Sequence, residues 1–402
     1  MIDLPQIKTK RLAVHLTTNA EKLVKQGHPW IFENSIAKLN KAGSSGDIAI
    51  FFDNRSDKVF GIGLYDPDSP IKIKVLSNVP ATINEEFFKT RIKEAFSLRK
   101  QLLRTNTNSY RLIFGENDGF PGLIADVYND VIVVKIYSAI WFPYLEEILP
   151  ELIETSKANT MVLRLSRNVA KGKSHGLTDG QVIYGTLKKE VVRFVEHGVK
   201  FSANVIHGHK TGYFLDHRNN RKRVGDMAKG KTVLDVFSYA GGFSVHALAG
   251  GATQVLSLDI SAQALQVALE NGKLNKHSGK HKILAIDAFE GLQQLIDEGE
   301  KYDIVVIDPP SFAKSAKEVN TARNSYARLA QLGTKLTAKK GMLVLASCSS
   351  RVEAEAFFDI CELNIKKADR KFTVEGKTYH DSDHPISFPE GAYLKCGYYR
   401  LN

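Results

Sequence analysis

Cysteine is scarce in this chain, with three among 402 residues: Cys348, Cys361 and Cys396. They lie near the C-terminus without a Cys-x-x-Cys pair, so the sequence predicts neither a disulfide framework nor a zinc finger. Long apolar runs are also missing, and the start MIDLPQIKTKRLAVHL lacks the apolar core of a secretory signal. We therefore expect a cytoplasmic protein with no membrane partner, in which a cysteine with a role is catalytic rather than structural.

Acidic side chains are outnumbered by basic ones, 44 Asp and Glu against 55 Lys and Arg, for a formal net charge of +11. Such a surplus fits a polyanionic partner such as nucleic acid. Many ordinary globular proteins are mildly basic too, so charge alone leaves both interpretations open. The apolar share of 43% and charged share of 25% exclude a disordered chain, and the length predicts two to three domains.

Three segments differ in their patterning. The first, residues 1–76, has short β-branched runs at 48–52, 59–65 and 71–76, separated by clusters of Gly, Pro, Asp, Asn and Ser. These features predict a small all-β barrel that serves as a binding module. The second segment, residues 77–189, is expected to be a small central α+β domain.

The central segment opens with Asn84, a candidate N-cap that precedes two glutamates and apolar residues at helical spacing. A loop rich in Gly and Asn follows at 114–122, and a strand pattern covers 131–136. The run at 171–176 is interpreted as a flexible loop.

From residue 190 to 402, buried strand patterns alternate with helical ones. This βαβα order predicts an α/β fold, a doubly wound, Rossmann-like parallel sheet that binds ligands beyond the carboxyl ends of its strands. The expected strands are 232–237, 254–259, 282–287, 303–308 and 341–347, and the expected helices are 242–249, 262–274, 288–298 and 320–335.

The ends of the first three expected strands predict a site for a small cofactor. Asp235 precedes a short turn at Gly241 and Gly242, which fits neither a dinucleotide fingerprint nor a P-loop. Asp259 suits the two hydroxyls of a ribose, and Asp287 suits the amine of an adenine. Each aspartate could instead be a helix N-cap, but their recurrence at successive strand ends favours the cofactor.

The fourth and fifth strand ends carry the candidates for chemistry. Asp308 is followed by Pro309 and Pro310, which keep the backbone extended and hold the carboxylate at the edge of the sheet. Cys348 ends the fifth strand, where it is either a small buried apolar residue or a thiolate nucleophile. The other two cysteines are expected in the core.

Residues 207–218 (HGHKTGYFLDHR) contain several histidines, yet Asp216 does not complete a common metal-ligand pattern, so we expect no metal. A polar segment that packs over a cofactor is the preferred interpretation. The basic run at 218–223 is interpreted as a solvated helix face that is open to RNA contact.

Taken in order and spacing, these motifs resemble, over essentially the whole chain, the large-subunit ribosomal RNA (cytosine-C5) methyltransferase I family. Its members are class I enzymes that depend on S-adenosylmethionine and carry an N-terminal PUA domain. The motifs are KQGHPWIF at 25–32, SYRLI at 109–113, GFPG at 119–122, residues 207–218, FSYAGGF at 237–243, DPPSF at 308–312, SCS at 347–349 and PEGAYLK at 389–395.

The resemblance implies roles for particular residues. Pro309, Pro310 and Phe312 would contact the target base, and the segment from Lys210 to Asp216 would close over the site. The residues implied to bind S-adenosylmethionine are Lys210, Thr211, Tyr213, Phe214, Asp216, Asp235, Phe237, Gly241, Gly242, Asp259, Asp287 and Asp308.

The resemblance also implies that Cys348 is the catalytic nucleophile, adding to C6 of a flipped-out cytosine so that C5 can accept a methyl group, with Asp308 assisting at N3. Ser311 stands where many such enzymes carry a second cysteine, so the agent of enzyme release is not identified. Two alternatives stay open: a nitrogen methyltransferase with Phe312 stacking on the base, and a non-catalytic RNA-binding assembly factor. The expected partner is large-subunit (23S) rRNA, and a homodimer is left open.

Overall fold

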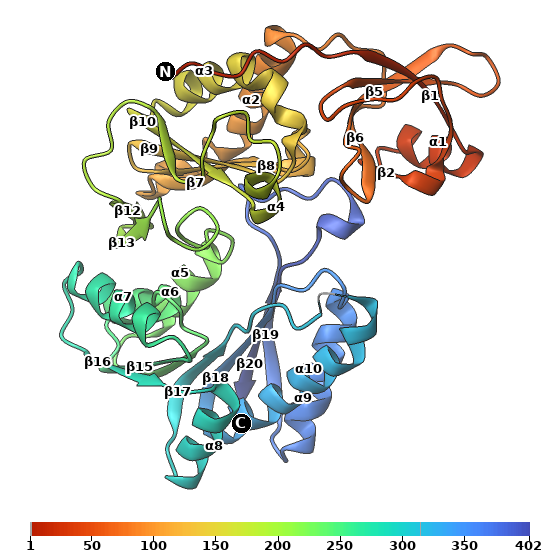
Figure 1. Ribbon diagram of the computed structural model, residues 1–402. Coiled ribbons are helices and arrows are strands. Elements are labelled where there is room, and N and C mark those ends of the chain that lie inside the picture. The colour runs from red at the N-terminus through yellow and green to blue at the C-terminus, as the bar shows by residue number, and fades with distance from the viewer. Residues whose placement is uncertain (1, 314) are drawn as a thin grey trace. The chain divides into compact units, whose positions relative to one another are not determined.

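The computed structural model describes residues 2–313 and 315–402, and the chain forms two compact units (Figure 1). Unit 1 comprises Met1–Val195, Ser202–Leu215 and Ser382–Gly391, and unit 2 comprises Glu196–Phe201, Asp216–Asp381 and Ala392–Asn402. The domain boundaries expected after residues 76 and 189 stay predictions. In the described residues, no helix combines the length and the apolarity that crossing a membrane requires.

The N-terminal part of unit 1 is a six-stranded sheet in the order β2-β6-β5-β4-β1-β3. The strands expected from the β-branched runs are confirmed as β4, β5 and β6. The inward side chains of the whole sheet, among them Leu12, Phe51 and Ile73, form a small core of their own. The elements are β1 (Arg11–Leu16), α1 (Thr18–Lys25), β2 (Trp30–Phe32), β3 (Ile36–Leu39), β4 (Ile48–Phe52), β5 (Val59–Tyr65) and β6 (Ile71–Ser77).

The rest of unit 1 is built on a five-stranded mixed sheet in the order β11-β10-β9-β8-β7. Asn84 is the N-cap of α2, as expected, because its side chain accepts a hydrogen bond from the Phe87 amide at 3.0 Å. The elements are α2 (Glu85–Arg99), β7 (Ser109–Phe114), β8 (Leu123–Tyr128), β9 (Val131–Ile136), α3 (Leu145–Ser156), β10 (Thr160–Leu165), α4 (Arg167–Lys171) and β11 (Gln181–Tyr184). Next along the chain, β12 (Val191–Glu196) and β13 (Val199–Asn204) pair as a two-stranded sheet.

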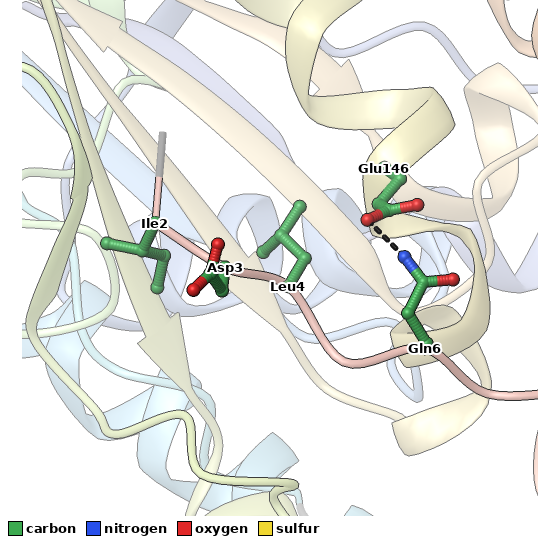
Figure 2. A pocket seen from close by; sticks show the side chains of 5 residues that line it. All are labelled: Ile2, Asp3, Leu4, Gln6 and Glu146. Carbon is green, nitrogen blue, oxygen red and sulfur yellow. Dashed lines mark hydrogen bonds between the residues drawn. The ribbon is translucent and has the colours of Figure 1, made fainter.

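A surface hollow of about 620 Å³ lies in unit 1, where the N-terminal segment runs past α3 (Figure 2). It is lined by Ile2, Asp3, Leu4, Gln6 and Glu146, and the Gln6 amide donates a hydrogen bond to the Glu146 carboxylate. These residues belong to no motif of the sequence.

Unit 2 contains the seven-stranded sheet, in the order β16-β15-β14-β17-β18-β20-β19. The first five of these strands run parallel, and β20 is antiparallel to both β18 and β19. This confirms the doubly wound α/β fold. The strands are β14 (Thr232–Val236), β15 (Gln254–Asp259), β16 (Lys280–Ala285), β17 (Tyr302–Ile307), β18 (Thr337–Ser347), β19 (Phe372–Thr378) and β20 (Lys395–Leu401).

Helices cover both faces of this sheet. Apolar side chains of α5 and α6 pack on one face, and those of α8, α9 and α10 pack on the other. Strand side chains alternate between the two faces, so Val233 contacts the first group of helices and Leu234 the second. The helices are α5 (Arg218–Met227), α6 (Gly242–Ala249), α7 (Ala262–Lys273), α8 (Ala288–Asp297), α9 (Val319–Leu336) and α10 (Ala354–Lys367).

Helix α5 corrects part of one expectation from the sequence, because two basic residues of the run at 218–223 are buried, while Lys222 is exposed as expected. Arg218 and Arg221 are 0% and 3% exposed. Arg221 donates two hydrogen bonds of 2.7 Å to the buried Glu196 carboxylate, and Arg218 pairs with Asp381 at 3.1 Å. A charge run predicts exposure only when no buried acid faces it, and Glu196 is supplied by a strand some twenty residues earlier.

Candidate cofactor and catalytic site

The first group of expected site residues lies where β14 runs into α6. Asp235, in β14, is 1% exposed, and its Oδ2 accepts hydrogen bonds from the amide and the hydroxyl of Ser244 at 2.9 and 2.6 Å. Its Oδ1 has no hydrogen-bond partner among the described residues. Burial, with the charge of Asp308 adding to it, raises the pKa of Asp235 to about 6. A buried carboxylate with an unpaired oxygen is a ready acceptor for a charged amine.

A series of hydrogen bonds through Ser244, Ser257 and His281 holds Oδ2 of Asp235 in place. The Ser244 hydroxyl lies 2.6 Å from that of Ser257 on β15, which in turn lies 2.8 Å from Nε2 of His281 on β16. Burial lowers the pKa of His281 to about 4, so its ring is neutral near pH 7. The series orients one oxygen of Asp235 and leaves the other available.

The loop after β14 follows an unusual backbone path. Phe237, Tyr239 and Gly241 all have positive φ angles, of 62°, 48° and 79°. Bulky residues rarely adopt this conformation, and such clusters are typical of ligand sites. A Cβ atom on Gly241 would lie 2.7 Å from the Cβ of Ala268 in α7, so only glycine lets the loop lie this close to the helix.

Asp259 ends β15, and its carboxylate bridges two loops. Oδ2 accepts a hydrogen bond from the Tyr239 amide and Oδ1 one from the Ser261 amide, both at 2.9 Å. Each carboxylate oxygen keeps a further lone pair, which suits the adjacent hydroxyls of a ribose. Ile260, directly after it, is 75% exposed, an apolar surface beside the proposed ribose ligand. We had not singled out Ile260 from the sequence, although an apolar residue directly after an acidic strand end is a visible signal.

Asp287 occupies a different position from the one expected. Strand β16 ends at Ala285, and Asp287 is the N-cap of α8. Its Oδ1 accepts hydrogen bonds from the amides of Phe289 and Glu290 at 2.8 and 3.3 Å. The alternative role weighed for this aspartate is therefore present, and contact with an adenine stays a prediction.

Asp308 follows β17 directly and lies beside a buried histidine that we had not assigned to the site. Nε2 of His217 is 3.2 Å from Oδ1 of Asp308, and its Nδ1 lies 3.0 Å from the Asn220 side-chain amide. Burial is the largest single influence and disfavours the charged ring, but the charge of Asp308, the contact with its carboxylate and the charge of Asp216 together outweigh burial, so the pKa of His217 is raised. His217 thus holds the carboxylate at the strand end.

Cys348 follows β18 and faces the Asp308 loop rather than the core. Its Sγ donates to the Pro309 carbonyl at 3.5 Å, and its side chain is only partly buried, whereas Cys361 and Cys396 are buried as expected. Burial raises the pKa of the Cys348 thiol to about 12, and the charges of Asp308 and Asp216 act in the same direction. The two carboxylates and the thiol therefore share one region of unit 2.

The remaining residues expected to contact substrate line the same loop. The Phe312 ring packs edge-on against Tyr326 and Phe237, with centroids 5.3 and 6.5 Å apart. Pro309 is buried and Pro310 exposed. Asp216 accepts a hydrogen bond from the Tyr393 hydroxyl at 2.9 Å.

The other residues expected to close over the cofactor belong to unit 1. The Thr211 hydroxyl donates to Asp126 at 2.6 Å, and the Tyr213 carbonyl accepts a hydrogen bond from Tyr128 at 3.2 Å. Lys210 and Phe214 are exposed at the surface of that unit. Their contribution to the cofactor site stays a prediction.

These features fit S-adenosylmethionine. The unpaired oxygen of Asp235 matches its amino group, Asp259 matches its ribose, and the path of the loop at Gly241 lets backbone approach it closely. The group lies between the neighbouring parallel strands β14 and β17, where the strand order changes side: β15 and β16 are added on one side of β14, and β17 and β18 on the other. Open α/β sheets bind ligands at such a point.

Comparison with known proteins supports S-adenosylmethionine as the cofactor. A family model described as S-adenosylmethionine-dependent methyltransferase matches residues 176–363, and one described as a PUA-like domain matches residues 14–78. A solved methyltransferase structure from Streptococcus mutans superposes with a TM-score of 0.82 at 22% identity, covering 96% of this chain and 99% of that one. Another solved methyltransferase, complexed with SAH, has a TM-score of 0.81 at 23% identity over 98% of this chain and all of its own.

The protein is thus a class I methyltransferase whose cofactor is S-adenosylmethionine. Among its relatives, the ribosomal RNA large subunit methyltransferase of Deinococcus radiodurans is 40% identical over 99% of both chains. The ribosomal RNA large subunit methyltransferase I of Escherichia coli is 35% identical over 94% of this chain and 97% of its own. The chain belongs to this family of large-subunit ribosomal RNA methyltransferases, which confirms the resemblance seen in its motifs.

Proposed function

We propose that this protein methylates C5 of a cytosine in large-subunit ribosomal RNA, through a covalent bond between Cys348 and the base. The observation that carries the proposal is the position of the thiol. Cys348 alone of the three cysteines is only partly buried, and its Sγ contacts the loop of Asp308 at the carboxyl ends of the strands. A packing role would not need a thiol at this place.

The substrate class rests on the relatives, which are named for ribosomal RNA of the large subunit and align with nearly the whole of this chain. The PUA-like match at residues 14–78 and the formal net charge of +11 are compatible with an RNA partner. RNA therefore stands as the partner in this proposal.

In the proposed complex, Asp235 and Asp259 hold the amino group and the ribose of the cofactor. Ile260 packs against its adenine, beside Asp287. When bound, S-adenosylmethionine supplies an electrophilic methyl group. Asp308 faces the polar edge of a base presented to Cys348, and Phe312 borders the same loop.

The chemistry follows from the weak nucleophilicity of C5 in cytosine. The Cys348 thiol loses its proton to Asp308 as its sulfur forms a bond to C6. The electrons of the C5–C6 double bond move through C4 to N3, and Asp308 passes the proton on to N3. C5 is then an enamine carbon that can accept a methyl group. Loss of the C5 proton to a base, departure of the thiolate and return of the N3 proton restore the aromatic ring. Asp216 and Asp308 are the carboxylates whose charge acts on Cys348, so both are candidates for that base.

The resting thiol is held in its protonated form. With the pKa of Cys348 raised to about 12, only a minute fraction is thiolate at pH 7. The pKa of Cys348 must therefore fall when the positively charged cofactor and the base bind. Between reaction cycles the protonated thiol is protected from adventitious oxidation.

The test compares Cys348→Ala with Cys361→Ala, a matched variant that removes a buried thiol of the same unit. Ribosomal RNA from a strain lacking the gene is incubated with each purified protein and S-adenosylmethionine, and its nucleosides are analysed by mass spectrometry. We expect 5-methylcytidine with the wild type and Cys361→Ala and none with Cys348→Ala, while calorimetry gives the same cofactor affinity for all three.

Other outcomes contradict the proposal in different ways. Full activity of Cys348→Ala rules out the covalent mechanism. A methylated ring nitrogen or exocyclic amine as the product identifies a nitrogen methyltransferase. If no methyl group is transferred to the RNA and calorimetry detects no binding of S-adenosylmethionine, the protein is an RNA-binding assembly factor.

A further inference from the structure

A buried lysine lies next to the proposed nucleophile and has no role so far. Lys395, the first residue of β20, is 2% exposed. Its ammonium donates hydrogen bonds to the backbone carbonyls of Ser349, Val352 and Tyr393, the last two at 2.5 and 3.1 Å. An ammonium has three N–H donors, so all are used, whereas a neutral amine could satisfy only two of the carbonyls. The site is therefore built for the charged form.

The carbonyls show what the ammonium holds in place. Ser349 follows Cys348 in the chain, and Val352 lies in the same connection between β18 and α10. In the sheet, Ser347 pairs with Lys395, so the side chain reaches from β20 over the end of β18. The ammonium of Lys395 thus stabilises the turn after β18 that carries Cys348.

The charge of Lys395 is not neutralised by an acid. Among residues 2–313 and 315–402, no carboxylate forms an ion pair with it, although buried lysines are normally paired. Its three partners are neutral carbonyls, so its positive charge remains available to act on an ionisable group close by. Cys348 is such a group, because the charge of each of these residues shifts the pKa of the other.

We propose that Lys395 is a positioning residue for the nucleophile, fixing the turn that carries Cys348 and providing the positive charge that stabilises its thiolate. The inference rests on the proposed function, because the positive charge of Lys395 matters for catalysis only if Cys348 reacts as a thiolate. It assigns to the C-terminal PEGAYLK motif, of which Lys395 is the last residue, an effect on the reacting sulfur.

The groups that face the thiol set the sign of the effect. Asp308, after β17, and Asp216, before α5, disfavour the thiolate, and Lys395 favours it. Tyr326 of α9 is neutral near pH 7, because burial raises its pKa well above the usual range. Burial lowers the pKa of Lys395 to about 8, and the thiolate charge opposes that shift. Above about pH 8 the ammonium loses its proton, so the support it gives to the thiolate disappears.

The experiment measures alkylation of Cys348 by iodoacetamide in the full-length protein, followed by peptide mass spectrometry between pH 6.5 and 9.5. The variants are Lys395→Met, which keeps the length and removes the charge, and Lys395→Arg, which keeps a charge that does not titrate here. The control is Lys377→Met, because Lys377 pairs with Glu362 and its charge acts on Cys361 instead.

We expect Lys395→Met to react about tenfold more slowly than the wild type below pH 8, which corresponds to a thiol pKa about one unit higher. The two curves should converge above pH 8, where the wild-type lysine is also neutral. Lys395→Arg should stay near the wild-type rate below pH 8 and continue to rise above it without the wild-type inflection, and Lys377→Met should match the wild type throughout.

Three results would overturn the inference. Equal rates for Lys395→Met and wild type at every pH would show that the charge does not act on the thiol. A constant offset at all pH values would show that the lysine only supports the turn. If Lys395→Met does not fold, Lys395→Arg decides, and an unchanged inflection near pH 8 in that variant refutes the role of Lys395.

This test is separate from the test of the proposed function, because alkylation needs neither RNA nor methyl transfer. Full methylation by Cys348→Ala together with slow alkylation of Lys395→Met would refute the covalent mechanism but support the effect of Lys395 on the thiol. Loss of methylation in Cys348→Ala with unchanged alkylation of Lys395→Met would support the covalent mechanism and refute the effect of Lys395.

Discussion

The tight approach of the cofactor loop to α7 can be tested with the substitution Gly241→Ala. Gly241 has a φ of +79°, and an added Cβ would lie 2.7 Å from the Cβ and 3.1 Å from the Cα of Ala268. The left-handed backbone costs an alanine about 1–2 kcal/mol. Overpacking of a close contact adds about 1–3 kcal/mol. The unfolding free energy of unit 2 should therefore fall by about 2–5 kcal/mol.

Gly230→Ala is the matched control. Gly230 also lies in unit 2 and has a φ of +72°, but nothing lies within 4 Å of the position that its Cβ would take. It should bear the backbone cost alone, about 1–2 kcal/mol. The difference between the two variants therefore isolates the contact with Ala268.

The assay must report on unit 2. Both tryptophans, Trp30 and Trp141, belong to unit 1, so their fluorescence does not follow unfolding of the sheet that carries the site. Hydrogen exchange of the β14 amides, followed at increasing urea concentrations, gives the stability of unit 2. Calorimetry should show at least a tenfold loss of S-adenosylmethionine affinity for Gly241→Ala and none for Gly230→Ala. Equal stability and equal affinity of the two variants would refute the reasoning.

Three further predictions concern charge in unit 2. Because the folded state keeps the proton of Asp235 up to about pH 6 while the unfolded chain releases it near 3.8, the unfolding free energy should fall as the pH rises through that window, by up to about 3 kcal/mol. In Asp235→Asn, the unfolding free energy measured in urea should no longer fall as the pH rises through this window. Glu196→Gln leaves Arg221 buried without its acid and should cost about 3–5 kcal/mol in the same assay. Glu375 pairs with Arg400 at 2.7 Å, and both side chains are about a third exposed to solvent. Glu375→Gln, which breaks this pair, should therefore cost less than about 1 kcal/mol, and equal costs for the two variants would contradict the burial argument. Asp287→Ser keeps an N-cap oxygen, so stability should change by less than about 1 kcal/mol; calorimetry should still show weaker cofactor binding, and unchanged affinity would remove Asp287 from the site.

Local patterns in the sequence predicted the elements of unit 2 closely. The expected helix 242–249 and strand 254–259 coincide with α6 and β15. The pattern succeeded because a parallel strand covered on both faces is a continuous apolar run, and its end is marked by a polar or turn residue. The prediction was wrong by two residues at β16, because this strand is largely exposed and contains lysines, so polar residues do not mark its end. Asp287 is therefore a helix N-cap and not the last residue of a strand.

The sequence alone determined the doubly wound sheet, the small β-barrel pattern and the strand-end positions of Asp235, Asp259 and Asp308, because apolar runs and the polar or turn residues that end them are local properties of the chain. Only the tertiary structure decided which distant residues meet. It brought His217 to Asp308 and set the uncompensated charge of Lys395 beside the turn of Cys348. Burial and pairing depend on contacts between segments far apart in the chain, and no local pattern encodes them.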